Sequence, residues 1–566
     1  MTGAGSCRGR AARAANRAVE IYHLAIGPGE PTGIATKEAK EAGKGDKWLD
    51  DLLAWIKTAE AHFSVKTMNI FHQLLLLCLL FLPWSTRAAD AARPNIVWIL
   101  VDDMSANFSC YGETTIRTPH VDALAAQGTR FARAFVTAPI CSISRSALLT
   151  GCYQTSIGGQ NHRSGSEKFP ITLPAGMKTV PQLLKEAGYH ASNISFEEFL
   201  RANGPVKIAK TDYNFVWDRP ANYDRTHWAD RQAGQPFFAQ VQLQGGKHRG
   251  QKPGPAWPKK AAAALGSLTP TNAVKLPPYL PEDETIRADW AQYLDAVRYT
   301  DWEVGRIVQR LKDAGELERT VIIFWTDHGI SHVRNKQFLY DGGIHVPLVM
   351  RGPGVAAGKV REDLVEHIDI AAVTLALAGL PRPASMQARD VFAKDYAPKE
   401  FVFAARDRAD ETVDRIRSVR SDQFKYIRNF YPTRPYLQPN RYKDEKAIVQ
   451  TMRRLHAEKK LTPAQSLIMA ETRPLEELYD LKADPHELRN RAADPALAAQ
   501  LARHHKALDD WMARTDDKGR APEPEEIYLN YIHDERPEGG RGNRNEVFEK
   551  NIELMLRWSK EKPMQP

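Results

Sequence analysis

The sequence predicts an α/β protein in which a large, mixed and mostly parallel sheet carries helices on both faces, followed by a smaller C-terminal α+β domain. Three observations lead to this fold. Residues 94–101 and 321–326 are apolar and rich in branched side chains, as strands covered on both faces are. Helical stretches that end in glycine lie between such strands. This alternation runs from Pro94 to about Leu380, which is typical of a parallel sheet.

Each element has its own signal. Residues 118–128 have proline near their start and glycine at their end, the two residues that favour those helix positions, and residues 180–188 repeat the pattern. The elements expected after the first strand follow in chain order: helices at 118–128 and 180–187, a strand at 235–241, a helix at 293–314 and a strand at 321–326.

The character of the chain changes near Ala397. Short strands at 401–404 and 424–427 are expected there, followed by helices and a polar tail after Pro522. We therefore expect one large domain at 93–395 and a C-terminal subdomain with its tail at 396–566.

The N-terminal part of the chain has the pattern of a secretory signal. Residues 74–82 are apolar but too few to cross a bilayer, and small residues follow them. The sequence therefore predicts a signal peptide at 68–92 and a secreted or periplasmic protein without stable membrane insertion after cleavage. Residues 1–67 are interpreted as an extension or a mis-called start, with translation beginning at Met68.

Charge and cysteine content exclude two classes of protein. The 566 residues carry a net charge of +9, but no block of lysine and arginine is long enough for a nucleic-acid arm. Cys110, Cys141 and Cys152 remain after the signal, too few for a disulfide framework. If Cys141 has a chemical role, Cys110 and Cys152 are left either to pair or to be buried as thiols.

Two acidic clusters stand where buried strands are expected to end. Asp102 and Asp103 follow the first strand, and Asp327 with His328 follows the strand at 321–326. Ligands of parallel α/β folds bind at the carboxyl ends of strands, and carboxylate oxygens are the donors that Ca²⁺ prefers. A turn or helix cap is the alternative interpretation of each cluster taken alone.

Cys141 opens a helix-like run that continues through Leu149. A helix N-terminus stabilises a thiolate and favours a bound anion. Arg145, one turn further on, could hold an anionic oxygen with two parallel hydrogen bonds. A buried structural cysteine beside a surface arginine is the alternative.

Four stretches together resemble the type I sulfatases of the alkaline-phosphatase superfamily, over roughly Arg93 to Asn490: NIVWILVDD (95–103), CSISRSALLTG (141–151), VIIFWTDHG (321–329) and ELYDLKADPHEL (477–488). The resemblance implies an alkaline-phosphatase-like fold. It also implies that a maturation enzyme oxidises Cys141 to formylglycine, whose hydrate offers one hydroxyl for attack on sulfur and a second for expelling sulfate. The implied Ca²⁺ ligands are Asp102, Asp103, Cys141, Asp327 and His328.

The resemblance implies roles for further residues. Arg145, Lys210 and His248 would act with Cys141 in catalysis, and Lys336 would bind the sulfate group. Asp212 departs from the family pattern, which has histidine there, and His332 or His162 could take that place. Ile143 departs as well, because proline or alanine is usual at this position of the maturation signal. An apparent insertion at 195–206 is a third departure.

A basic stretch in the C-terminal region has two interpretations. Its arginines, with Tyr426 and Tyr436 nearby, are Arg406, Arg408, Arg415, Arg417 and Arg420. They form either a solvated charged face or a rim that binds a polyanionic sugar chain, with Arg406 and Arg408 as substrate-binding residues.

These observations favour a secreted, Ca²⁺-dependent sulfatase that acts on sulfate esters, or on sulfamates, of sulfated glycans. Two alternatives remain. One is a phosphodiesterase or phosphonate hydrolase of the same superfamily, and the other is an inactive sulfatase-like protein that binds glycans.

Overall fold

The rest of the chain is organised around an eight-stranded sheet. Strand β1 (Asn95–Val101) lies near the middle of this sheet. The computed structural model describes residues 93–249, 256–534 and 546–565, so the predictions for 1–67 and 68–92 lie outside the described residues. The strand order is β3-β4-β1-β5-β6-β2-β7, and β8 pairs with β2. The other strands are β2 (Thr129–Phe135), β3 (His190–Ser195), β4 (Phe237–Leu243), β5 (Thr320–Thr326), β6 (His345–Arg351), β7 (Lys359–Arg361) and β8 (Val365–Glu366).

The sheet is mixed and mostly parallel, which confirms the predicted fold class. Strands β3, β4, β1 and β5 run parallel to one another. Strand β6 is antiparallel to both β5 and β2, while β7 and β8 are parallel to β2. These four neighbouring parallel strands therefore end at the same edge of the sheet.

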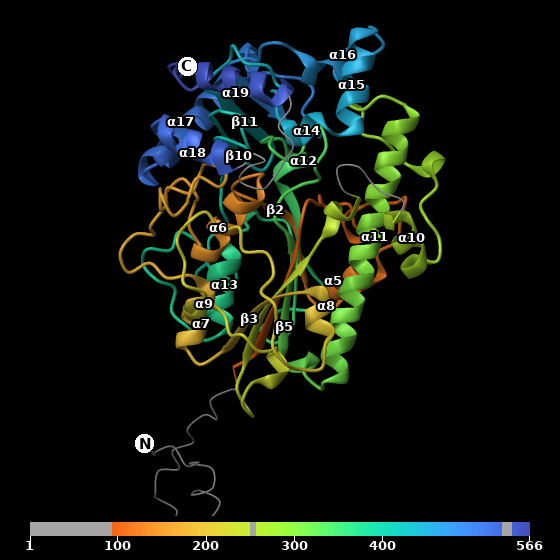
Figure 1. Cartoon of the computed structure of the whole chain (residues 1–566), viewed down its shortest axis with the longest axis vertical. Helices are drawn as coiled ribbons and strands as arrows, with labels where there is room; N and C mark the ends of the chain where they lie inside the picture. Colours follow the sequence, from red (N-terminus) through yellow and green to blue (C-terminus); the bar gives the residue numbers. More distant parts are fainter. Residues whose placement is uncertain (1–92, 250–255, 535–545, 566) are drawn as a thin grey trace, which may run out of the picture. The chain divides into compact units, whose positions relative to one another are not determined.

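Helices cover both faces of the sheet (Figure 1). Alternate side chains of β1 enter two different hydrophobic cores, so that Trp98 lies in one and Ile99 in the other. The first core contains side chains of α6 (Cys141–Thr150), α7 (Val180–Glu186) and α13 (Asp369–Leu377). The second contains side chains of α5 (Pro119–Ala126), α8 (Phe196–Leu200), α10 (Ala256–Leu265) and α11 (Glu284–Asp313).

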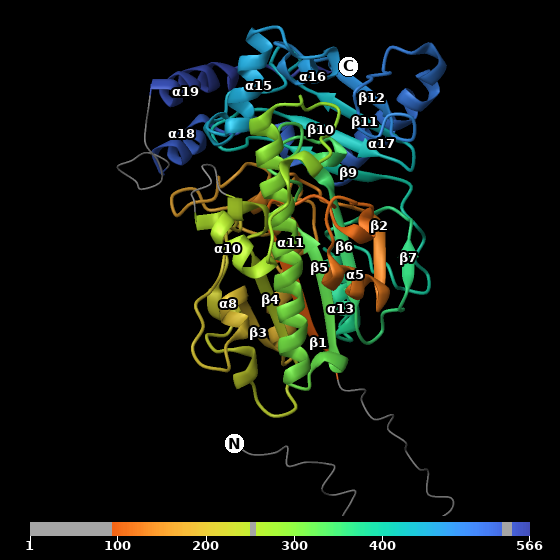
Figure 2. The same ribbon diagram turned by 90° about the vertical axis from the view of Figure 1, so that its right-hand side faces the viewer.

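A second, antiparallel sheet forms the C-terminal part (Figure 2). Its order is β12-β11-β10-β9, with β9 (Val402–Arg406), β10 (Ile416–Arg420), β11 (Phe424–Asn429) and β12 (Glu476–Asp480). Side chains of this sheet enter the first hydrophobic core, so the core runs through both sheets. The remaining helices are α9 (Arg219–Asn222), α12 (Asp341–Ile344), α14 (Arg441–Asp444), α15 (Ala447–Ala457), α16 (Pro463–Ser466), α17 (Ala498–Arg514), α18 (Glu525–Asp534) and α19 (Glu546–Trp558).

Two features of the described residues bear on cysteine chemistry and on membranes. Cys110, Cys141 and Cys152 are all free thiols, so the possible pairing of Cys110 with Cys152 does not occur. Within the described ranges, no helix combines the length and the apolar character needed to cross a bilayer.

The arginines of the basic stretch are buried and paired with carboxylates. Arg406 pairs with Asp414, and the Arg408 Nε lies 2.5 Å from the Glu523 Oε2. Arg406 and Arg408 each have less than a tenth of their surface exposed. The carboxylates of Asp414 and Glu523 lie against them. Arg406 and Arg408 therefore do not form the exposed rim expected from the sequence. They hold the C-terminal segments together.

Replacing Arg417 by methionine is expected to lower the free energy of unfolding by about 3–5 kcal/mol. The Arg417 guanidinium donates two hydrogen bonds to Asp517, at 2.7 and 2.9 Å, and one to Asp407 at 3.0 Å, all buried. Its loss leaves two buried carboxylates without their partner. Equilibrium unfolding in guanidinium chloride measures the change. In the control, Arg503→Met removes the exposed pair with Glu400 and should cost less than about 1 kcal/mol. Equal losses in both variants would contradict this role of Arg417.

Candidate active site

The acidic clusters lie side by side at the ends of β1 and β5. Val101 and Thr326 are register partners, so the residues that follow them are neighbours. The Asp327 N–H donates to the Val101 carbonyl at 2.9 Å, and the Asp103 N–H donates to the Asp327 Oδ1 at 3.2 Å. Asp103 adopts a positive φ of 54°, a conformation that aspartate tolerates better than most residues. The strand pairing therefore fixes both clusters against one another.

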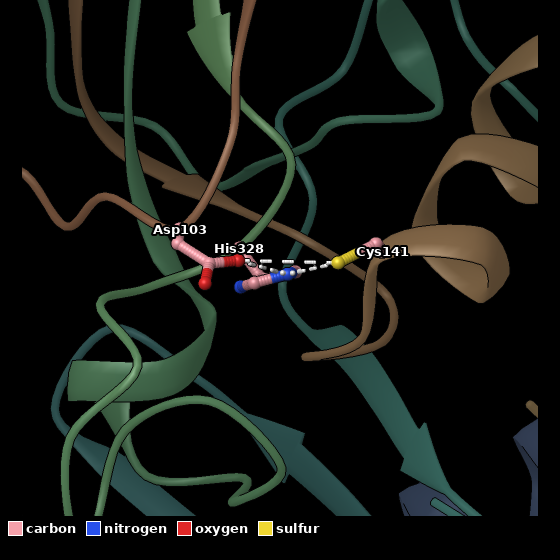
Figure 3. A group of neighbouring side chains, drawn as sticks. All are labelled: Asp103, Cys141 and His328. Atoms are coloured by element: carbon pink, nitrogen blue, oxygen red, sulfur yellow. Dashed lines mark hydrogen bonds and ion pairs between the residues drawn. The ribbon is translucent and has the colours of Figure 1, made fainter. Parts of the chain in front are cut away.

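Cys141 is the first residue of α6, and its thiol faces the acidic clusters (Figure 3). The Cys141 Sγ lies 3.1 Å from the His328 Nε2 and 3.9 Å from the Asp103 Oδ1. The His328 Nδ1 donates to the Gly329 carbonyl at 2.9 Å. Burial lowers the pKa of His328, but Asp327 and Cys141 raise it further than burial lowers it, which favours a protonated Nε2 that donates to the Cys141 Sγ.

Arg145 joins α6 to three strand ends. Its guanidinium donates from Nε to the Asp327 Oδ2 at 3.1 Å, from Nη2 to the Asp102 Oδ1 at 2.7 Å and from Nη1 to the Gln242 Oε1 at 2.6 Å. The side chain is fully buried. Because each of its three nitrogens bonds to another protein group and the side chain is fully buried, Arg145 orients the site.

Three lysines approach the thiol from different segments. The Lys336 Nζ lies 3.3 Å from the Cys141 Sγ and 2.9 Å from the Asp103 Oδ1. The Lys247 Nζ lies 3.7 Å from the Cys141 Sγ and 3.0 Å from the Asp102 Oδ2. The Lys210 Nζ donates to the Asp102 Oδ1 at 2.9 Å. Lys210 and Lys247 keep 25% and 33% of their side-chain surface exposed, so the site opens on their side.

Two glycines let the chain after β4 come close to the acidic pair. A Cβ added to Gly245 would lie 2.3 Å from the Asp102 carbonyl oxygen, and one added to Gly246 would lie 2.1 Å from that of Asp103. Any larger residue at these positions would push the two segments apart. The pair of glycines therefore allows Lys247 to reach Asp102 and Cys141.

The surrounding charges favour the ionised form of the thiol. Burial raises the pKa of Cys141, but the positive charges of Lys210, Lys247 and Lys336 outweigh burial and hold that pKa well below its usual range. The same balance applies to the Asp103 carboxylate. Burial raises its pKa, but the positive charges of Lys336 and Lys247 have the larger effect and hold that pKa well below its usual range. Cys141 and Asp103 are therefore both favoured in their ionised forms at neutral pH.

Asp212 is paired with cations of the site. Its carboxylate lies 3.4 Å from the Lys210 Nζ and 3.9 Å from the Arg145 Nε. Burial raises the pKa of Asp212, but Lys210 and Arg145 bring it down to about 2, so the group stays charged. His162 does not take its place, because the His162 Nδ1 lies 3.0 Å from the Asp410 Oδ1.

Two histidines expected at the site lie elsewhere. The His248 ring stacks on Trp257 with centroids 4.8 Å apart, and burial lowers its pKa to about 4. The His332 Nε2 bonds to Asp289 and lies 2.6 Å from the Arg249 Nη1. The resemblance assigned His248 to the site. In the structure the preceding residue, Lys247, points to Cys141 instead.

Sequence reasoning missed three residues of the site. Lys247, Tyr442 and Gln242 each contact a predicted site residue, and the Tyr442 hydroxyl donates to the Asp103 Oδ2 at 2.9 Å. Lys247 directly precedes His248, the residue to which the resemblance assigned a catalytic role. Nothing in the sequence connected Tyr442 of α14 to residues more than 300 positions earlier.

Ile143 fills a small apolar cluster. It is 1% exposed and packs with Ala138, Ile140 and Ala409. The fold therefore accommodates isoleucine where the family has proline or alanine. All ten residues of α6 are buried, so this segment is accessible to another enzyme only before the chain folds.

The donor set fits a bound divalent cation. Ligand atoms of Asp103, Cys141 and His328 lie within 4.8 Å of one another, and so do those of Asp102, Cys141 and Asp327. Carboxylate oxygens are hard donors that suit Ca²⁺. Asp102, Asp103, Asp327 and His328 are the residues that would hold such an ion beside residue 141.

Comparison with known proteins identifies the family of this chain. Residues 94–380, about half of the chain, match the family described as sulfatase, and residues 328–468 match the C-terminal region of N-sulphoglucosamine sulphohydrolase. The chain is 31% identical over 477 residues to an ulvan-active sulfatase of Formosa agariphila, which covers 77% of each protein. It is 26% identical over 478 residues to the human N-sulphoglucosamine sulphohydrolase, covering 75% of this chain and 91% of that protein.

Solved structures share the fold. A sulfatase-like protein from Bacteroides thetaiotaomicron has a TM-score of 0.53 at 20% identity, over 77% of this chain and 96% of that one. A similar protein from Bacteroides fragilis has a TM-score of 0.53 at 17% identity, over 78% of this chain and 98% of that one. On its family match and its similarity to the Formosa enzyme, the chain belongs to the sulfatase family, the enzymes that hydrolyse sulfate esters.

Proposed function

We propose that this chain is a secreted sulfatase that cleaves sulfate from sulfated glycans, with formylglycine derived from Cys141 as its nucleophile and Ca²⁺ as its metal. The observation that supports this proposal most strongly is the approach of Lys210, Lys247 and Lys336 to the acidic groups around residue 141. The signal peptide predicted from the sequence at 68–92 supports the proposed export.

The side chains around residue 141 are arranged for an anionic substrate. Lys247 and Lys336 have pKa values well above the usual range, because Asp102 and Asp103 outweigh the effect of burial. Both therefore stay protonated and act through charge rather than by proton transfer. Together with Lys210 they would bind the sulfate oxygens and stabilise the negative charge that develops there during hydrolysis.

Two groups would complete the site. A formylglycine would supply a hydrated aldehyde, one hydroxyl of which displaces the sugar from sulfur while loss of the proton from the other breaks the bond to sulfate and restores the aldehyde, and Ca²⁺ would supply positive charge that lowers the pKa of a hydroxyl. Arg145 orients Asp102 and Asp327 for this role, and the His328 Nε2 faces residue 141 at the distance of a direct contact.

Similar proteins support a sulfated glycan as the substrate. One relative is named an ulvan-active sulfatase and another an N-sulphoglucosamine sulphohydrolase. The second name supports a sulfamate as an alternative to a sulfate ester. The partial exposure of Lys210 and Lys247 gives a sugar-linked sulfate access from the solvent side.

Lys247→Ala is expected to lower kcat/KM for an aryl sulfate by about 10- to 100-fold, because it removes a charge-assisted contact to the sulfate group. His248→Gln should lower it by less than about threefold, because the His248 ring packs on Trp257 away from Cys141. Initial-rate kinetics on protein made with a formylglycine-generating enzyme measures both.

Thermal unfolding of both variants is the control for folding. A larger loss in the folded His248→Gln protein would contradict the assignment of Lys247. An aryl phosphodiester assayed in parallel tests the rival activity, and faster phosphodiester turnover by the wild-type protein would contradict the sulfatase proposal.

Chelator-treated protein is expected to bind one Ca²⁺ in a calorimetric titration, and Asp103→Asn should weaken this binding by about tenfold or more, because it removes the negative charge and one of the two oxygens of the ligand. Asparagine tolerates the positive φ of 54° at this position, so the backbone is preserved. Asp212→Asn is the matched control, because Asp212 pairs with Lys210 and Arg145 instead of joining the converging donors. Loss of Ca²⁺ binding in Asp212→Asn, with binding kept in Asp103→Asn, would refute this ligand set.

A further inference from the structure

Lys446 is a buried lysine without an acidic partner. It is 5% exposed and stands directly before α15. Among the described residues, no carboxylate forms an ion pair with its ammonium group, whose recorded contact is the ring of Tyr442, 4.7 Å from Nζ to the ring centroid. A buried charge of this kind is costly unless an anion compensates it.

The two carboxylates whose charges act on Lys446 are bonded to other groups, and they do not outweigh its burial. Asp289 is occupied by Arg249 and His332, and Asp103 by Lys336 and Tyr442. Lys443 adds a second buried amine, which donates to the His332 carbonyl and has no carboxylate partner among the described residues. Burial, assisted by Arg249, lowers the pKa of Lys446 to about 7, and burial with Lys446 lowers the pKa of Lys443 well below its usual range. A bound anion beside Lys446 would favour its protonated form and supply the partner that the described residues lack.

Tyr442 connects Lys446 to the reaction centre. The Lys336 Nζ, which contacts Cys141, also lies 4.7 Å from the centroid of the Tyr442 ring. Lys336 and Lys446 thus share one aromatic ring. Tyr442 is only half-buried, and Asp289 keeps 20% of its side-chain surface exposed, so solvent reaches this region beside the site.

We propose that Lys446 forms a subsite for a second anionic group of the substrate, a carboxylate or a further sulfate carried on the glycan next to the sulfate that is cleaved. The inference rests on the proposed sulfatase function and adds to it a requirement for a substrate with at least two negative charges. Tyr442 would separate the two anions and lie beside the sugar between them.

Matched pairs of substrates test the subsite. One pair is a sulfated disaccharide with a uronate carboxylate and its carboxyl-reduced counterpart, and the other is a disulfated disaccharide and its monosulfated counterpart. The quantity measured is the ratio of kcat/KM within each pair. The wild-type enzyme should favour the more acidic member of at least one pair by about tenfold or more. The pair that shows the preference identifies the anion as carboxylate or sulfate.

Lys446→Met should reduce that preference to less than about twofold, because methionine keeps the volume of the side chain and removes its charge. Lys446→Arg should retain most of it. Arg454→Met in α15, the helix that Lys446 precedes, is the matched control, since Arg454 is 52% exposed and pairs with Glu458, and it should leave the preference unchanged. If Lys446→Met fails to fold, Lys446→Gln takes its place.

The outcomes separate this inference from the function on which it rests. An unchanged preference in folded Lys446→Met, or no preference in the wild-type enzyme, would overturn the subsite while sulfatase activity stands. A wild-type enzyme that hydrolyses aryl sulfate and neither disaccharide pair would overturn the subsite together with the glycan substrate. Absence of any sulfate release, aryl sulfate included, would contradict the proposed function itself.

Discussion

The guanidinium group of Arg145 is the interaction on which the site depends. From the second turn of α6 it reaches Asp102 after β1, Asp327 after β5 and Gln242 at the end of β4. One rigid, fully buried fork therefore fixes the helix that carries Cys141 against three parallel strands. A lysine could not replace it, because a single ammonium group cannot bond in three fixed directions of one plane.

Charge compensation explains how so many ionised groups are buried together. The carboxylates of Asp102, Asp103 and Asp327 would repel one another in a protein interior without cations beside them. Arg145 and the three lysines provide this compensation for Asp102 and Asp103, and the lysines in turn leave Cys141 in a strongly positive environment. Burial, together with Asp102 and Cys141, raises the pKa of Asp327 to about 7. The same arrangement suits an anionic substrate, so the electrostatics that stabilise the site also define what it binds.

Much of this architecture could be predicted from the sequence because strand ends carry local signals. The apolar runs before Asp102 and Asp327 predicted two buried strands, and parallel pairing then placed both acidic clusters at one edge of the sheet. The choice between Lys247 and His248 depends on which way a short 3-10 helix turns its side chains, which the sequence pattern does not reveal. The contact of Tyr442 with Asp103 and that of Arg408 with Glu523 join residues far apart in the sequence, and they become visible only in the folded chain.

The most direct test of the account is the mass of residue 141 in active protein. Mass spectrometry of the tryptic peptide from Ala134 to Arg145 distinguishes a thiol from an aldehyde at this position, even though Ile143 departs from the usual maturation signal. The assignment of Cys141 as the precursor of the nucleophile predicts that a preparation which releases sulfate contains the aldehyde at residue 141. A preparation that releases sulfate while this peptide is entirely in the thiol form would contradict it.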